Sequence, residues 1–351
     1  MPLLARMVAS PLTVDVRDGA IEALPALLAD SRISPEGQIA VAVGPGQGER
    51  VVASLGPALA KAGIHRIDAG TVTAARELAD DLRQGHYDAV VAIGGGRTLD
   101  VAKYAASLVG MPNVAVATSL AHDGIASPVA SLEHDGHKAS YGVQMPLAVL
   151  ADLGYVRRCP RALLAAGLGD ALSNLNAVAD WELSGAQTGE PVDGLAVAIA
   201  RSAAESLLHR PDELVTDDFL TTLAHALVLG GLAMAVAGSS RPCSGSCHAI
   251  AHALNVVAPG DRFHGAEVAV GALFSSWLRD DPNVEALDAC LRRHGVPRLP
   301  ADLGVTDEQF AAAVEQAPVM RADRYTVLSQ LQLSGDDVRA RVREYVRAFD
   351  R

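Results

Sequence analysis

An alternation of short apolar runs with helical patterns between Ile39 and Gly154 is the feature that most constrains how this chain folds. Each apolar run has the length of a buried β-strand and is followed by a turn or a helical pattern. The first helical pattern ends at Gly63. Strands and helices that alternate in this way predict a parallel sheet with helices on both faces, as in doubly wound folds. The expected strands are IAVAV from residue 39, IHRIDAG from 64, DAVVAI from 88, NVAVATSL from 113 and LAVLADL from 147.

The sequence changes character near Gly154. Just before it, residues 131–146 are polar and predict a hairpin or an excursion from the sheet. Beyond Tyr155, Ala- and Leu-rich helical segments follow one another without a convincing strand. We therefore expect two domains in the 351 residues, an α/β domain at residues 1–154 and an all-α domain at residues 155–351.

Charge and hydropathy exclude several classes of partner and location. The formal net charge of −12 argues against nucleic acid or an anionic membrane as the partner. Residues 226–238 form the most apolar later run, which is too short to span a bilayer and predicts a buried helix. The first 19 residues are interrupted by Pro2, Arg6 and Pro11 and lack the apolar core of a secretory signal. We expect a cytoplasmic protein.

The four cysteines are too sparse for a disulfide framework, and reduced thiols are expected. They are Cys159, Cys243, Cys247 and Cys290. The spacing of Cys243 and Cys247 leaves a zinc-thiolate site open as an alternative, although no second pair accompanies them.

Three histidines fall within SCHAIAHALNVVAPGDRFHG, residues 246–265. His248 and His252 are four residues apart and share one face of a predicted helix, and His264 follows a loop that allows it to fold back towards them. A single histidine on an apolar face is usually a structural residue, but three together suggest ligands. Asp170 follows a Gly-Leu-Gly break in an apolar helical segment, and an acid there must be paired or coordinated. Asp170 is therefore our candidate for the ligand that completes the site with the histidines.

Two segments at strand ends are candidates for binding a ligand. AIGGGRTLDVAK, residues 92–103, places glycines between a strand and a helix, where free N–H groups can bind a pyrophosphate, although such turns also serve packing. The usual GxGxxG fingerprint is absent. ATSLAHDGIASPVAS, residues 117–131, follows the next strand and lies at the same edge of the sheet, with an N-cap and a turn as the plain alternative. Asp68 is either a ribose contact or a turn residue.

Six motifs, taken in order, resemble the glycerol-1-phosphate dehydrogenases, in the superfamily of iron-containing alcohol dehydrogenases, glycerol dehydrogenases and dehydroquinate synthases. They are GGGRTLDVAK, TSLAHDGIASP, GLGDALSNLNAVADWEL, SRPCSGSCHAIAHALN, HGAEVAVGAL and RADRYTVL, and the resemblance spans roughly residues 39–330. It implies an N-terminal nucleotide-binding α/β domain and a C-terminal helical domain that binds metal and substrate, as in dehydroquinate synthase-like folds.

The resemblance also implies roles for individual residues. Asp170, His248 and His264 match the metal ligands. Asp123 and His252 match positions that contact substrate, which Asp170 also borders, so these three are the expected catalytic residues. The expected nicotinamide dinucleotide site comprises Gly95, Gly96, Arg97, Thr98, Asp100, Thr118, Ser119 and Ser127.

Three positions depart from the family pattern. Arg97 stands where relatives usually have Lys, and Cys247 and Ala266 stand where they usually have acids, so the ligand set is intact while the substrate is in doubt. The expected cofactors are NAD(H) or NADP(H) and one divalent metal ion, Zn²⁺ favoured over Fe²⁺.

The activity that we favour is an oxidoreductase of phospholipid metabolism, which interconverts dihydroxyacetone phosphate and sn-glycerol 1-phosphate. A dehydrogenase of an unphosphorylated alcohol or polyol is the alternative, and a sugar phosphate cyclase or a non-catalytic NAD-binding protein fits less well. The expected partner is a small molecule, in a homo-oligomer. Lys138, in the polar excursion, is a candidate for meeting the substrate phosphate, or else a solvated loop lysine.

Overall fold

The computed structural model describes residues 10–350, which divide after Cys159 into two compact units. The first unit contains a six-stranded sheet in which every pair of neighbouring strands is parallel. Its strand order is β1-β8-β5-β4-β2-β3. The strands are β1 (Thr13–Arg17), β2 (Ile39–Val43), β3 (Gly63–Arg66), β4 (Ala89–Gly94), β5 (Asn113–Ala117) and β8 (Ala148–Asp152).

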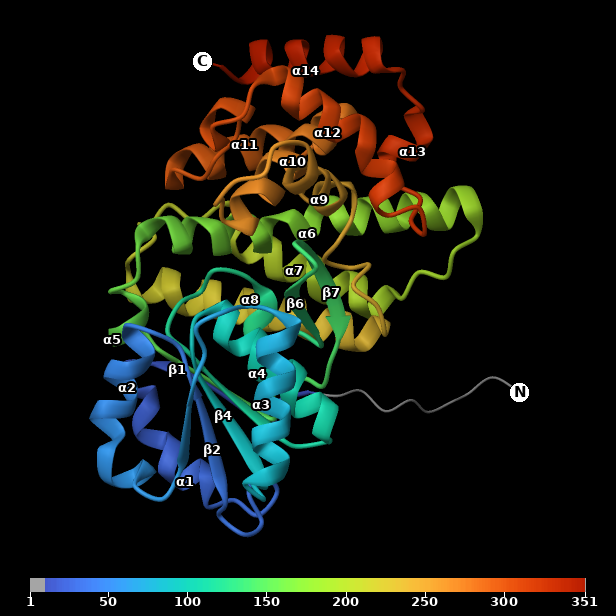
Figure 1. The fold of residues 1–351 in the computed structure, drawn as a ribbon. Helices are drawn as coiled ribbons and strands as arrows, with labels where there is room; N and C mark the ends of the chain where they lie inside the picture. Colours follow the sequence, from blue (N-terminus) through green and yellow to red (C-terminus); the bar gives the residue numbers. More distant parts are fainter. Residues whose placement is uncertain (1–9, 351) are drawn as a thin grey trace. The chain divides into compact units, whose positions relative to one another are not determined.

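Helices cover both faces of this sheet, as the alternating sequence pattern predicts. α1 (Leu24–Leu28) and α2 (Gln47–Leu55) lie on one face, and α3 (Val72–Gln84) and α4 (Gly96–Val109) on the other (Figure 1). Alternate residues of the central strands, such as Val41, Val91 and Val116, form a core with the first helix pair. The predicted α/β class of this half is confirmed.

The structure differs from the predicted elements, or refines them, in three details. The helix after β2 ends at Leu55 rather than Gly63, because Pro57 follows and the chain continues as the short 3₁₀ helix η2 (Gly56–Leu59). The polar excursion is a hairpin of β6 (Val129–His134) and β7 (His137–Gly142), whose turn residues Asp135 and Gly136 both have positive φ. β1, which pairs with β8, was not predicted from the sequence.

The second unit is helical throughout the part that the structure describes. Figure 1 shows the long helix α6 beside α7, with α9 and α10 packed on it. The helices are α6 (Arg161–Thr188), α7 (Gly194–Leu208), α8 (Asp217–Ala237), α9 (Ser246–Val257), α10 (His264–Leu278), α11 (Val284–His294), α12 (Asp307–Met320), α13 (Val327–Leu331) and α14 (Gly335–Phe349). The absence of strands expected beyond Tyr155 therefore holds for the described residues.

Two helices are long and apolar enough to cross a membrane by length and composition, α6 and α8. The structure buries 78% of the most apolar window of α6 and 67% of that of α8 inside the protein. The run at 226–238 thus belongs to a longer helix than predicted, and that helix is largely buried.

Two further predictions concern the domain boundary and the N-terminal residues. The boundary predicted after Gly154 falls within α5 (Leu153–Val156), a short helix that packs on β1 and β8 of the first unit. The predicted lack of a secretory signal rests partly on residues 1–9, which lie outside the described residues.

Candidate functional site

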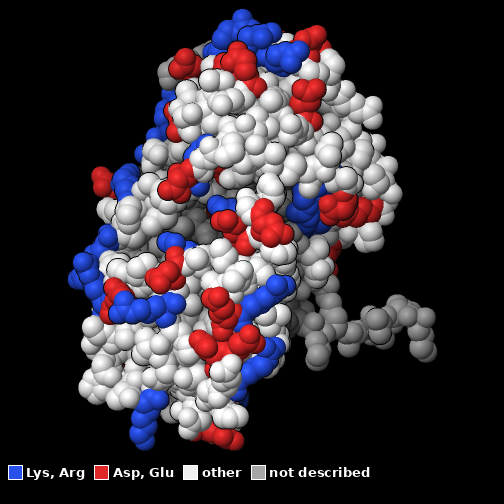
Figure 2. All heavy atoms as spheres, in the orientation of Figure 1, with Lys and Arg blue, Asp and Glu red and all other residues white. Residues whose placement is uncertain are grey.

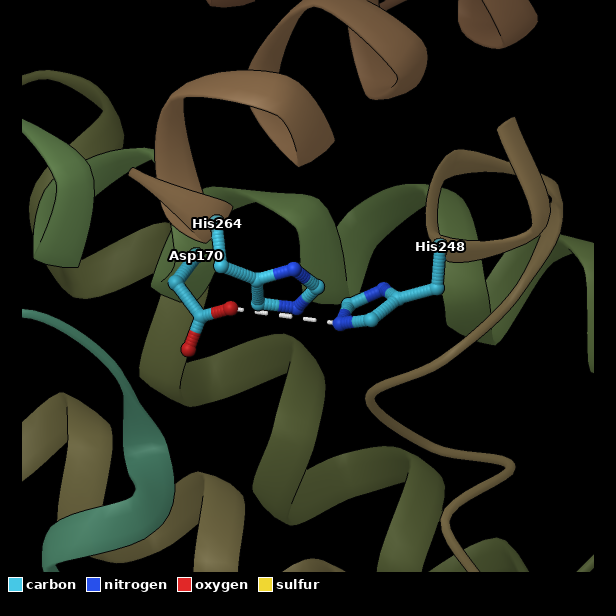
Figure 3. A group of neighbouring side chains, drawn as sticks. All are labelled: Asp170, His248 and His264. Carbon is cyan, nitrogen blue, oxygen red and sulfur yellow. Dashed lines mark ion pairs between the residues drawn. The ribbon is translucent and has the colours of Figure 1, made fainter. Parts of the chain in front are cut away.

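Asp170, His248 and His264 converge in the helical unit, and we call them the triad. They come from α6, α9 and the first residue of α10, and one ligand atom from each lies within 4.8 Å of the others. Figure 3 shows the His264 ring beside the Asp170 carboxylate, with His248 pointing at the pair from the other side. His248 Nε2 lies 3.9 Å from Asp170 Oδ1, and the two imidazole centroids are 5.0 Å apart. The loop before His264 does fold back towards His248.

Glycines next to two of the triad residues allow α6 and α10 to approach closely. A Cβ on Gly265 would lie 1.9 Å from the carbonyl oxygen of Ala166, and one on Gly169 would lie 2.4 Å from that of Gly265. α6 therefore runs unbroken through the Gly-Leu-Gly segment, where the sequence predicted a break. The glycines serve this contact, which brings Asp170 and His264 together.

Two buried polar side chains of α6 hold the start of α9, which carries His248. Asp180 accepts hydrogen bonds from the backbone N–H of Ser246 (2.7 Å) and from its hydroxyl (2.6 Å). Asn176 Oδ1 accepts from Cys247 N–H (3.2 Å) and lies 3.1 Å from the Ser246 hydroxyl oxygen, whose single proton goes to Asp180. These bonds satisfy N–H groups that a helix start leaves without partners. Neither residue was predicted from the sequence, although polar residues in an apolar helical segment were a signal for them.

The electrostatic surroundings keep His248 neutral. Burial is the main cause, and the neighbouring imidazoles and the charge of Arg324 add to it, so the pKa of His248 lies well below its usual range. A neutral imidazole is the form that binds a metal ion. His252 lies one turn further along α9, with its ring centroid 6.2 Å from that of His264. The Asp170 carboxylate, the neutral His248 ring and the His264 ring form a donor set that fits a divalent transition metal.

Two of the three positions that depart from the family pattern, Cys247 and Ala266, are buried beside the triad. Cys247 follows Ser246 in α9, and Ala266 follows Gly265 in α10. The next residue, Glu267, directs its carboxylate to Arg262 Nε (2.9 Å) and Asn255 Nδ2 (3.0 Å). All four cysteines are free thiols, as expected, and Cys243 donates to the carbonyl of Gly230.

The α/β unit brings the two candidate cofactor segments together at a point where the strand order reverses. From β2 the chain moves to β3 on one side and then to β4 on the other, so the carboxyl ends of β2 and β4 form the crevice where open α/β sheets bind ligands. There a Cβ on Gly44, in the turn after β2, would lie 2.3 Å from Thr98 Oγ1. This second glycine turn was not predicted from the sequence to be part of the cofactor site.

The turn between β4 and α4 has the features expected of a pyrophosphate site. Gly95 caps α4, and no side chain in the described part of the chain caps this helix start. A Cβ on Gly95 would lie 3.1 Å from Ser119 Oγ, and Thr118 N donates to Gly94 O (2.9 Å). A Cβ on Gly96 would lie 2.0 Å from His122 Nε2, so the missing side chains leave room for the loop after β5.

The remaining cofactor candidates differ in exposure. Arg97 is exposed and donates to the carbonyl of Asp68 (3.0 Å) at the end of β3. Asp100 is buried in an ion pair with Lys103 (3.0 Å), and Ser127 donates to Val129 O (3.1 Å). Direct contact of Asp100 and Ser127 with the cofactor stays a prediction, because their polar groups bond to Lys103 and Val129 inside the protein.

Asp123 begins the short 3₁₀ helix η3 (Asp123–Ile125) of the same unit. Burial raises the pKa of its carboxyl, against the lowering effect of His122 and Lys103. Lys103 also donates to the carbonyl of Gly124 (2.7 Å), which fixes this turn.

Comparison with known proteins places the chain among metal-dependent dehydrogenases. The family model described as iron-containing alcohol dehydrogenase matches residues 15–160. The glycerol-1-phosphate dehydrogenase [NAD(P)+] of Thermofilum pendens is 42% identical over 250 residues, covering 70% of this chain and 72% of that protein. The enzyme of the same name from Hyperthermus butylicus is 33% identical over 330 residues, covering 92% and 94%.

Solved structures share the fold. A probable glycerol dehydrogenase from Sinorhizobium meliloti superposes with a TM-score of 0.77 at 24% identity, covering 99% of each chain. The sulfoacetaldehyde reductase of Bifidobacterium kashiwanohense, solved with NAD+, gives a TM-score of 0.73 at 18% identity and covers 97% of this chain and 99% of its own. At these identities the likeness establishes the architecture alone.

Proposed function

We propose that this chain, which belongs to the glycerol-1-phosphate dehydrogenase family, interconverts dihydroxyacetone phosphate and sn-glycerol 1-phosphate with a nicotinamide dinucleotide and a divalent metal ion. The convergence of the triad within 4.8 Å is the observation that carries the proposal. Family membership makes the chain an NAD(P)-dependent oxidoreductase, and the triad supplies the donor set that metal-dependent carbonyl reduction requires.

We assign the two cofactors to different parts of the chain. Residues 1–154 would bind the dinucleotide at the crevice between β2 and β4, with N–H groups of Gly95, Gly96 and Arg97 at the start of α4 meeting the pyrophosphate. Thr98, Thr118 and Ser119 line the same turn region. Residues 155–351 would hold the metal and the substrate.

The triad residues would bind the metal, and His252 and Asp123 would serve the proton and the substrate. Zn²⁺ is our choice over Fe²⁺, and when bound it supplies a Lewis acid that polarises the substrate carbonyl. Asp170 would bring a carboxylate to the site, and the neutral ring of His248 leaves a nitrogen lone pair for coordination. His252, one turn from His248 on α9, would hold or move a proton at the substrate oxygen.

The substrate phosphate needs a cationic partner, and two arginines of the helical unit are better candidates than Lys138. Lys138 is exposed on β7 of the hairpin. Arg324 donates to Ser240 Oγ (2.8 Å) and to the carbonyl of Ser244, just ahead of α9. Arg321 and Arg324 lie close enough to His248 for their charges to lower its pKa. Arg321 keeps part of its side chain exposed.

A substrate panel with both dinucleotides, read by nicotinamide absorbance, tests the proposal. Dihydroxyacetone phosphate should be reduced with a higher kcat as well as a lower KM than dihydroxyacetone, because binding energy from the phosphate positions the carbonyl. Arg321→Ala should weaken the phosphorylated ketone selectively, with Lys138→Ala as the exposed control. Equal kcat/KM for the two ketones would refute the phosphate substrate and favour a polyol dehydrogenase.

We place the enzyme in the cytoplasm as a homo-oligomer that acts on a small molecule. Basic and acidic side chains are interspersed over the face drawn in Figure 2, and the net charge is −12. Both observations support a small-molecule partner over nucleic acid or an anionic membrane. Light scattering on the purified protein determines the oligomeric state.

A further inference from the structure

The Cys247 thiol lies against the ring of a triad histidine. Its Sγ is 3.4 Å from Nδ1 of His248 and 4.0 Å from the carbonyl oxygen of Ser173 on α6. The cysteine is fully buried between α6 and α10, where a Cβ on Gly271 would lie 2.8 Å from its carbonyl oxygen. Backbone and side chain of residue 247 are thus both fixed by neighbouring helices.

The protonation of the two groups suits a chain of hydrogen bonds. His248 directs Nε2 towards Asp170, so a neutral ring that offers Nε2 to a metal carries its proton on Nδ1 and points it at Sγ. The sulfur of a cysteine is both a weak donor and a weak acceptor of hydrogen bonds. The Cys247 thiol can therefore accept from the imidazole while it donates to the carbonyl of Ser173.

We propose that Cys247 is a positioning residue, whose sulfur holds the His248 ring with Nε2 facing the metal. The inference rests on the proposed function, since it requires the triad to bind a metal ion. Asn176 and Asp180 already hold the backbone at the start of α9. Rotation of the His248 ring is the freedom that remains, and the contact with Sγ restrains it.

Metal affinity measured by chelator competition with Zn²⁺ tests this role. Cys247→Ala should weaken Zn²⁺ binding by roughly 10- to 100-fold, the usual effect of losing a group that orients a ligating histidine. Cys290→Ala is the matched control, because Cys290 is also fully buried and its thiol also meets a backbone carbonyl, that of Leu207 at 3.7 Å. Both variants lose the same atoms, but only Cys247 touches the triad. Cys247→Ser, which keeps a donor and an acceptor, should restore most of the affinity.

Equal Zn²⁺ affinity in the two alanine variants would overturn the positioning role while leaving the triad as the metal site. Failure of the unmodified protein to bind Zn²⁺ would instead reject the proposed metal site and the Cys247 role with it. A measurement without any variant of Cys247 guards against misfolding: nitrogen-15 NMR of the Zn²⁺-loaded protein, with His248→Asn to assign the signal. The proton of His248 should reside on Nδ1, and a proton on Nε2 would overturn the inference.

Discussion

Replacing Gly265 by alanine tests whether the close approach of α6 and α10 builds the triad. The new Cβ would lie 1.9 Å from the carbonyl oxygen of Ala166 and 3.0 Å from its Cα, where ordinary contact begins near 3.4 Å. The helices would have to separate by about 1.5 Å, because backbone on both sides cannot rotate away. His264 is the adjacent residue, and metal–ligand distances tolerate only about 0.2 Å. We therefore expect this substitution to dismantle the site.

Two quantities should fall together in Gly265→Ala. Overpacking of this kind costs about 1–3 kcal/mol in the free energy of unfolding, which urea denaturation of the metal-free protein measures. Zn²⁺ affinity should drop by more than about tenfold, as for other disturbances of a metal site. Gly194→Ala is the control, since Gly194 begins α7 with nothing within 4 Å of its missing Cβ, and it should be neutral or slightly stabilising. Unchanged stability and affinity in Gly265→Ala would refute the packing argument.

Four further outcomes are expected. Alanine at any triad histidine, or asparagine at the aspartate, should remove the metal and nearly all turnover while the α/β unit stays folded; elemental analysis and circular dichroism check this, and normal metal content would reject the ligand. His252→Ala should keep the metal and lose rate, seen in the pH–rate profile, whereas loss of metal would make it a ligand. Arg97→Ala should raise KM for the dinucleotide more than for the ketone, and an unchanged cofactor KM places it outside the site. Arg241 holds the pKa of Glu190 below its usual 4.5, so this stabilisation is present at neutral pH and lost as pH falls through the lowered pKa; urea midpoints of Glu190→Gln should therefore change less on acidification than those of the unmodified protein.

The strand and helix order was predictable where local pattern and final environment agree. β2, β4, β5 and β8 are buried on both faces, so each appears in the sequence as an apolar run. β1 was missed because it is partly exposed and carries polar residues between its apolar ones, and its partner β8 lies far along the chain. Its existence depends on a pairing that no local window contains.

In the helical half, local propensity predicted a helix break that the structure does not have. Gly167 and Gly169 resemble a helix break when only local propensity is considered, which predicts weakness wherever glycine stands. The structure continues α6 through both, because tertiary contact with α10 outweighs propensity and requires a residue without a side chain at Gly169. The same glycine that argued against a continuous helix is the one that lets Asp170 reach His264.

The candidate site was predictable only as far as its donors. Residues suited to metal binding have a characteristic chemistry, so Asp170 and the three histidines could be found as candidates from type and spacing. The choice of His248 and His264 over His252 came from the family resemblance. Asn176 and Asp180 act through hydrogen bonds to backbone groups some 70 residues away, which any helix start offers, so no spacing rule identifies their partners. The geometry of such a site depends on its donor residues, which the sequence indicates, and on the helix packing that positions them, which only the fold shows. Substitutions in the packing should therefore weaken metal binding in proportion to how far they move a donor, even though they touch none.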